Sequence, residues 1–145
     1  MTGETNKAVV RRWFDELFSR GNLDVVEEII DPDYILHDPG FPQGIRGIQA
    51  FREFIRRLRT AFPDLHSTLE DIMAAEDDRV VTRDRWGGTN RGSFLGFDAT
   101  NKQVTAIGID IFRLANGKIV EQWASPDLLG AAVQLGLISL PGVGH

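Results

Sequence analysis

The chain has 145 residues, a length that fits one domain (1–145) built around one hydrophobic core. Its residues are 42% hydrophobic and 26% charged, which is typical of a soluble globular protein and argues against disorder. The formal net charge is -5 without a basic region, so we expect no nucleic-acid partner.

Several further classes of protein are excluded by what the chain lacks. It has no cysteine, which excludes disulfides and thiolate chemistry and fits a cytoplasmic protein. It has no apolar run long enough to span a membrane, and the polar residues 1–7 do not resemble the core of a signal peptide. Its three histidines (His37, His66 and His145) are too widely spaced for helical metal ligands, so we expect no bound metal.

The first part of the chain predicts helices. A helix is expected to end near Gly21, because apolar residues recur before it at helical spacing: Val10, Trp13, Phe14, Leu17 and Phe18. A short second helix follows Asn22 and ends at Asp31-Pro32.

A short strand at 34–36 is expected to lead into His37-Asp38-Pro39, and residues 40–47, rich in glycine and proline, predict a loop. The clearest helix follows and ends at Pro63. Its apolar residues follow a three-four spacing: Ile48, Phe51, Ile55, Leu58 and Phe62.

After Pro63 the pattern is typical of strands, expected over 65–75, 80–86, 104–114 and 118–124. The first of these should contain a bulge, because Leu69 and Ile72 do not share a two-residue period. Residues 87–96 are irregular, and 127–135 predict a last short helix. The pattern favours an α+β fold, a conical barrel of a strongly curved, mostly antiparallel sheet covered by N-terminal helices. The interior of the cone is the expected ligand site.

The dipeptide Asn116-Gly117 predicts a two-residue hairpin turn, which fixes how the last two strands pair. In an uninterrupted register Asp110 lies opposite Trp123, and Phe112 lies opposite Glu121. Alternation places these residues on the same face as two small ones, Ala106 and Gly108. Because small residues beside an acid leave room for a ligand, we assign this face to the cavity.

The opposite face of the same strand carries three isoleucines, Ile107, Ile109 and Ile111. It should be the convex side of the sheet. Its apolar character predicts that a second subunit covers it.

Asp110 is the first candidate catalytic residue, because a lone carboxylate in an apolar strand is costly and its pKa tends to rise. Asp127 follows Pro126 at the start of the last helix, so a capping role competes with a catalytic one. In the expected register it lies roughly 13 Å along the strand from Asp110.

The other candidates have plain structural alternatives. His37 and Asp38 enter a loop, where Asp38 before a proline also shapes turns. Trp13 and Phe14 are core residues that would also line a cone. Glu121 fits a surface ion pair equally well. We interpret Arg83-Asp84-Arg85 as part of a solvated face.

A series of short stretches runs in order along nearly the whole chain. They include YILHDP (34–39), AFPDL (61–65), TNK (100–102), GIDIFR (108–113) and GKIVEQW (117–123), followed by Asp127. In this order they resemble the SnoaL-like polyketide cyclases of the nuclear-transport-factor-like, cystatin-type α+β superfamily. Asn90 departs from the pattern, since many relatives have histidine after the Gly-Thr pair.

The resemblance implies a conical barrel, a homodimer, and neither metal nor organic cofactor. Cyclases of this family close a ring of an aromatic polyketide ester by an intramolecular aldol-type condensation, with one carboxylate as acid/base. By match that carboxylate is Asp127, with Asp110 and His37 as partners in the pocket. The expected ligand is a small hydrophobic molecule, contacted by Trp13, Phe14, Phe112, Glu121 and Trp123.

Related functions are alternatives. Ketosteroid isomerases of the same superfamily have an aspartate base matching Asp38 and an oxyanion-hole acid matching Asp110, but Trp13 replaces their tyrosine. The limonene-epoxide-hydrolase type ranks lower, because 83–85 does not place Arg and Asp two apart on one face. A non-catalytic binding module remains open. So does a structural dimer whose apolar tail after Gly136 closes the pocket.

Overall fold

The computed structural model describes residues 2–142. Helical segments come first: α1 (Gly3–Arg12), a π-helical segment (Trp13–Ser19), a 3₁₀ turn (Leu23–Val25) and α2 (Val26–Ile29). They are followed by β1 (Ile30–Asp38), β2 (Phe41–Arg46), α3 (Ile48–Ala61), β3 (His66–Ala75), β4 (Arg79–Thr89), β5 (Gln103–Ala115), β6 (Lys118–Pro126) and α4 (Leu128–Gln134).

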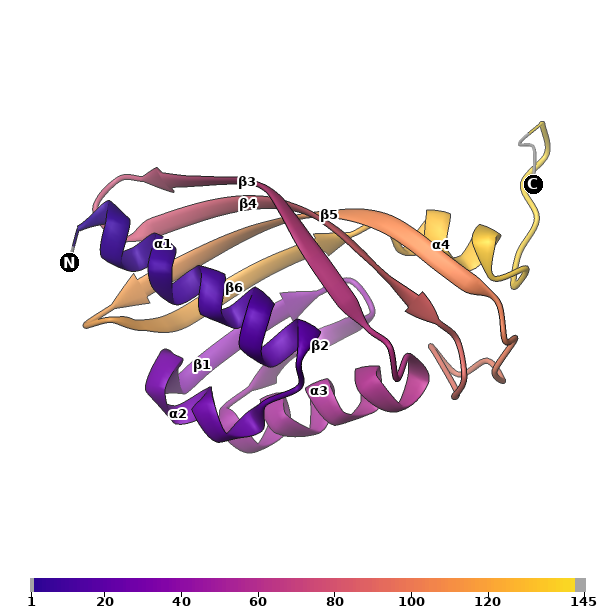
Figure 1. The fold of residues 1–145 in the computed structure, drawn as a ribbon, viewed down its shortest axis with the longest axis horizontal. Helices are drawn as coiled ribbons and strands as arrows, with labels where there is room; N and C mark the ends of the chain where they lie inside the picture. Colours follow the sequence, from indigo (N-terminus) through magenta and orange to yellow (C-terminus); the bar gives the residue numbers. More distant parts are fainter. Residues whose placement is uncertain (1, 143–145) are drawn as a thin grey trace.

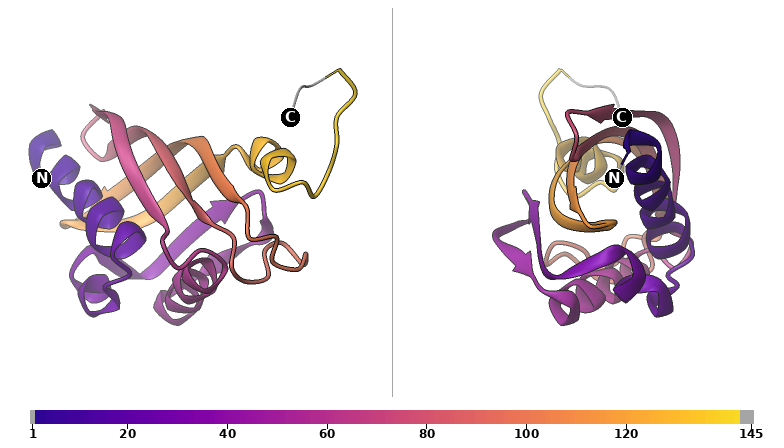
Figure 2. Two further views of the ribbon diagram at one scale, coloured as in Figure 1. Left: turned by 45° about the vertical axis from the view of Figure 1, so that its right-hand side comes forward. Right: turned by 90° about the vertical axis from the view of Figure 1, so that its left-hand side faces the viewer.

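The six strands form one sheet in the order β2-β1-β6-β5-β4-β3. Within residues 2–142, β1 and β6 run parallel, while every other neighbouring pair is antiparallel. The sheet bends strongly, and α1 and α3 lie against its hollow side (Figures 1 and 2). This arrangement confirms the predicted curved α+β cone.

One predicted loop is wrong. Most of 40–47 forms strand β2, which pairs with β1 through Ile35 with Arg46 and Leu36 with Ile45. Because β2 is an edge strand, Pro42 costs little there, and Gly44 adopts a positive φ of 79°. The predicted bulge in β3 is confirmed by a register shift between Leu69 and Asp71.

The predicted hairpin register is also wrong beyond the turn. Ala115 pairs with Lys118 as expected, but Arg113 pairs with Glu121, and Val120 is left as an extra residue. Asp110 therefore lies opposite Ala124 rather than Trp123. Phe112 lies opposite Gln122 rather than Glu121. The bulge reverses the face to which every later side chain of β6 points.

The face assigned to β5 is confirmed. Ile107, Ile109 and Ile111 are exposed on the convex side, while Gly108 and Asp110 are buried on the concave side. Aromatic side chains fill the space between the π-helical segment and the sheet. The Phe112 ring lies 5.7 Å from that of Trp13 and 5.8 Å from that of Phe14. A second apolar cluster surrounds Phe62 and Trp86 beneath α4.

The described part of the C-terminal tail does not close the cone. Residues 137–142 lead from α4 away from the sheet (Figures 1 and 2). Residues 143–145, including His145, lie outside the described part of the chain.

Candidate functional site

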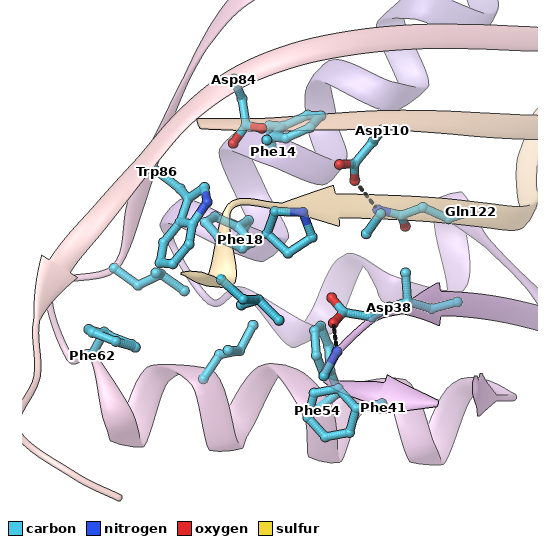
Figure 3. A pocket seen from close by; sticks show the side chains of 18 of the residues that line it. Phe14, Phe18, Asp38, Phe41, Phe54, Phe62, Asp84, Trp86, Asp110 and Gln122 are labelled. Carbon is cyan, nitrogen blue, oxygen red and sulfur yellow. Dashed lines mark hydrogen bonds between the residues drawn. The ribbon is translucent and has the colours of Figure 1, made fainter. Parts of the chain in front are cut away.

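A cavity of about 80 Å³ lies between the two apolar clusters of the cone. Its walls are mainly aromatic and include Trp13, Phe14, Phe54, Phe62 and Trp86. Among the described lining residues there are three carboxylates, Asp38, Asp84 and Asp110, and no basic side chain (Figure 3). The fold therefore gathers three acids from three strands into one apolar space.

Two of these acids flank one small residue. Ala124 on β6 pairs with Asp110 on β5. On the other side of β6, His37 pairs with Trp123, so the next residue of β1, Asp38, is level with Ala124. The alanine methyl leaves space between the two acids, and both face the cavity.

Asp110 is the most deeply placed acid and is held by a buried relay. Its Oδ2 accepts a 2.7 Å hydrogen bond from Gln122 Nε2, and Gln122 Oε1 accepts a 2.6 Å bond from the Tyr34 hydroxyl. Tyr34 and Gln122 are fully buried. Because the tyrosine donates to the amide oxygen, the amide nitrogen must face Asp110.

Burial raises the pKa of Asp110 to about 7. The nearby charges of Asp84 and Asp38 add to this rise, and the hydrogen bond from Gln122 opposes it. Asp110 is therefore shared between its protonated and ionised forms near neutral pH.

The interpretation of residues 83–85 as part of a solvated face is wrong for Asp84. Arg83 and Arg85 do point outward, to ion pairs with Asp71 and Glu70. Asp84 points inward and is 4% exposed. Its Oδ2 accepts a 2.5 Å bond from the Ser67 hydroxyl, and burial raises its pKa to about 6.

Asp38 combines the two roles that its sequence context suggested. Its Oδ1 accepts a 2.8 Å bond from the backbone N–H of Gly40, which shapes the turn between β1 and β2. The same side chain lines the cavity, and burial raises its pKa.

His37, Glu121 and Trp123 lie together, but outside the apolar cavity. His37 Nε2 is 2.8 Å from Glu121 Oε2, and the His37 ring stacks on Trp123 at 5.5 Å. Hydrogen bonds from His37 and Arg113 lower the pKa of Glu121. The extra residue in β6 explains this outcome, because it turns Glu121 and Trp123 to the face opposite Asp110.

The remaining predicted contacts are divided between wall and core. Trp13 and Phe14 line the cavity, whereas Phe112 packs behind them and is fully buried. Asp127 is exposed and caps α4, where its Oδ1 accepts a 2.8 Å bond from the Gly130 N–H. The structure thus brings Asp38 and Asp110 together and leaves Asp127 at the helix end.

Sequence reasoning missed Asp84, Trp86 and Gln122. Alternation along β4 gives a signal for the first two, because Val80, Thr82, Asp84 and Trp86 share one buried face. No local signal identifies Gln122, since its position depends on the bulge at Val120.

The curved sheet and the apolar cavity with its acids place the chain in a class of small cone-shaped α+β proteins. Comparison with known proteins identifies the family. The family model described as SnoaL-like polyketide cyclase matches residues 8–135. The chain belongs to this family.

Characterised relatives and solved structures agree. The chain is 28% identical to the nogalonic acid methyl ester cyclase of Streptomyces nogalater, over 82% of this chain and 89% of that protein. It is 31% identical to the aklanonic acid methyl ester cyclase DnrD of Streptomyces peucetius, over 88% of each. The structure of TsrD from Streptomyces laurentii matches with a TM-score of 0.84 and 27% identity, covering 95% of this chain and 99% of that one.

The described residues lack two further features. In 2–142, no helix has the length and apolar character needed to cross a membrane. The same part of the chain holds no group of three or more acidic, histidine or cysteine side chains placed to bind a metal ion.

Proposed function

We propose that this protein is a cyclase-type enzyme that closes a ring in a small hydrophobic carbonyl or ester compound, using Asp110 as general acid/base. The observation that carries the proposal is a buried carboxyl group with a pKa of about 7 in an aromatic cavity. A group with this pKa both accepts and returns a proton near neutral pH. Membership of a family with characterised ester cyclases supports the reaction class.

The proposed reaction is an intramolecular aldol-type condensation. Ionised Asp110 removes a proton from the carbon beside a carbonyl group, and the electrons of that C–H bond move into an enolate. The enolate carbon then forms a bond to a second carbonyl carbon of the same molecule. The new alkoxide takes its proton back from Asp110, so the side chain ends in its starting form. The proposed steps use no cofactor.

The other two acids support the enolate in this proposal. Burial raises the pKa of Asp84 to about 6 and also raises that of Asp38, so both hold a proton more readily than an exposed carboxyl group, and each donates a hydrogen bond when protonated. A donor aimed at an enolate oxygen is most effective where water is excluded. The apolar walls of this cavity provide that environment.

We assign the acid/base role to Asp110 rather than to Asp127, which the family resemblance favoured. Asp110 is buried in the cavity, whereas Asp127 is exposed and bonded to the first turn of α4.

Asp127→Ala is expected to lower the free energy of unfolding by about 1 kcal/mol, because it removes an N-cap. Its turnover should stay within about twofold of the wild type. Urea unfolding and initial rates check both numbers, and a hundredfold slower variant would return the acid/base role to Asp127.

An isomerase remains the second candidate. Asp38 and Asp110 face one cavity, which is the arrangement needed to take a proton from one carbon and return it to another. Wild-type protein should be assayed for proton exchange in D₂O with polyketide-like esters and with β,γ-unsaturated steroid ketones. Ring closure of the esters supports the cyclase, and double-bond migration supports the isomerase. Binding without exchange on either panel supports a binding module.

We also propose a cytoplasmic homodimer that buries the isoleucine face. Ile109 is 50% exposed between two other exposed isoleucines of β5. Ile109→Glu is expected to shift the protein from dimer to monomer in sedimentation experiments, because it places a charge in the apolar contact. Leu129→Glu, at a side chain 56% exposed on α4, is the matched control and should remain dimeric. A monomeric wild type would contradict the proposal.

A further inference from the structure

The buried relay that ends at Asp110 is closed to solvent along its length. The Tyr34 hydroxyl lies 2.6 Å from Gln122 Oε1, and Gln122 Nε2 lies 2.7 Å from Asp110 Oδ2. Tyr34 and Gln122 are fully buried, and Asp110 is 7% exposed. Because the first two groups are enclosed, a hydrogen bond lost between them is not replaced by one to water.

The tyrosine sets the direction of both hydrogen bonds. A phenol has one proton to donate, and a carboxylate only accepts. With the amide oxygen toward Tyr34 and the amide nitrogen toward Asp110, every group has a partner. A turned amide would place its oxygen against the carboxylate, and the phenol proton would lose the acceptor that the described residues give it. The hydroxyl group therefore holds the Gln122 amide in one orientation.

The fixed amide makes the two oxygens of Asp110 unequal. When a carboxyl group is protonated, the oxygen without the proton is the better hydrogen-bond acceptor. Because Gln122 donates to Oδ2, the proton is better placed on Oδ1. Figure 3 shows one oxygen of Asp110 bonded to Gln122 and the other pointing away from it. Asp110 lines the cavity, so it is this second oxygen that a ligand meets.

We propose that Tyr34 is a positioning residue for the reaction: its hydroxyl group holds the Gln122 amide nitrogen toward Asp110, which makes Oδ1 the oxygen that takes and returns the proton. This inference rests on the proposed function, since it assigns one atom of the proposed acid/base. The proton of the substrate C–H bond moves to Oδ1, and a proton leaves Oδ1 for the new alkoxide. Burial and the charge of Asp110 raise the pKa of Tyr34 well above its usual value, so the phenol keeps its own proton throughout.

The groups around Asp110 give the effect of the amide a defined sign. Asp84 on β4 and Asp38 on β1 face the same cavity, and their charges oppose the ionisation of Asp110. The hydrogen bond from Gln122 favours it. The π-helical segment and α3 present apolar side chains to the cavity, and these do not titrate. Loss of the amide donor must therefore make Asp110 harder to ionise.

Tyr34→Phe tests the positioning role, because it removes the hydroxyl group and keeps the ring that packs edge-on against Phe51. The amide is then free to turn when Asp110 is protonated, and its oxygen accepts the carboxyl proton. Since this stabilises the protonated form, the titration midpoint of Asp110 should rise by about one pH unit. The ¹³C signal of the carboxyl group measures the midpoint, and Asp110→Asn identifies that signal. An unchanged or lower midpoint would overturn the proposal.

A double-mutant cycle shows whether Tyr34 acts through the amide. Gln122→Met removes the donor and should raise the midpoint of Asp110 at least as much as Tyr34→Phe. In the Gln122→Met protein, Tyr34→Phe should add no further rise, and a full second rise would contradict the relay. Ser67→Ala is the matched control, since it removes a hydroxyl group that is bonded to another acid of the cavity, Asp84. An equal rise in this control would also contradict a specific role of Tyr34.

The wild-type protein gives a second measurement that needs no substitution. The chain has one tyrosine, so a ¹³Cζ label gives one signal, and its deuterium isotope splitting reports exchange of the hydroxyl proton. This exchange should be slow both above and below the midpoint of Asp110, because the hydrogen bond to the amide oxygen stays in place. Fast exchange below the midpoint would show that the amide turns, and it would overturn the fixed orientation.

The titrations need no substrate, so the two proposals fail separately. An unchanged midpoint in Tyr34→Phe would refute the positioning role and leave the acid/base role of Asp110 standing. Where turnover is measured, the acid limb of its pH profile should move upward together with the carboxyl midpoint. A limb that stays in place while the midpoint moves would refute the acid/base role and leave the relay intact.

Discussion

Asp110→Asn is expected to slow ring closure and α-proton exchange by about 10²- to 10⁴-fold, the usual contribution of a general acid/base. Asparagine keeps the size of the side chain, and its amide oxygen still accepts the bond from Gln122 that the structure shows at 2.7 Å. Substrate affinity should therefore change little, and the loss should appear in kcat. Initial rates over a substrate series separate the two effects.

Glu121→Gln is the matched control for this loss. Glu121 is an acid on the same hairpin, but it points away from the cavity to His37 and Arg113. Its turnover should remain within about twofold of the wild type. An Asp110→Asn enzyme that retains most of its rate would exclude Asp110 as the acid/base.

The same substitution is expected to stabilise the fold at neutral and alkaline pH. The pKa of Asp110 is about 7 in the folded protein, against a reference value of 3.8. Below pH 4 both states bind the proton, so the group costs nothing. Between pH 4 and 7 the unfolded chain ionises and the folded one does not, so the wild type loses stability as pH rises. Above pH 7 the loss is complete, at about 4 kcal/mol.

Urea unfolding of wild type and Asp110→Asn at pH 4 and pH 8 measures this difference. The stabilisation by asparagine should be near zero at pH 4 and largest at pH 8. Glu121→Gln should behave in the opposite way, because the folded-state pKa of Glu121 is lowered. Its ionisation stabilises the fold, and this contribution is lost as pH falls. A pH-independent effect of Asp110→Asn would show that the buried acid does not carry a raised pKa.

The fold was largely predictable from patterns that repeat over several turns or residues. The spacing from Ile48 to Leu58 predicted α3, because a buried helical stripe has a fixed period. Strand β2 was missed because glycine and proline indicate loops, and an edge strand tolerates both. Whether residues 41–46 form the edge strand of the sheet depends on their pairing with β1, and no local sequence pattern encodes that pairing.

The site was predicted less well, for a physical reason. Asp110 was identified because a charge in an apolar strand needs an explanation. Asp84 was overlooked between two arginines, although alternation alone places it on the opposite face. The positions of Gln122, Glu121 and Trp123 depend on one unpaired residue, and the turn sequence does not reveal it.

Val120 gives this family member a route to new chemistry that requires no change of side-chain type. With the extra residue, β6 presents Gln122 and Ala124 to Asp110. If Val120 were instead paired within a regular ladder, alternation would present Glu121 and Trp123, and would replace an amide donor by a fourth acid. A slip of one residue in the pairing of this hairpin would therefore exchange one set of cavity residues for another. The position of a bulge is thus a source of functional divergence that comparison of aligned residues alone overlooks.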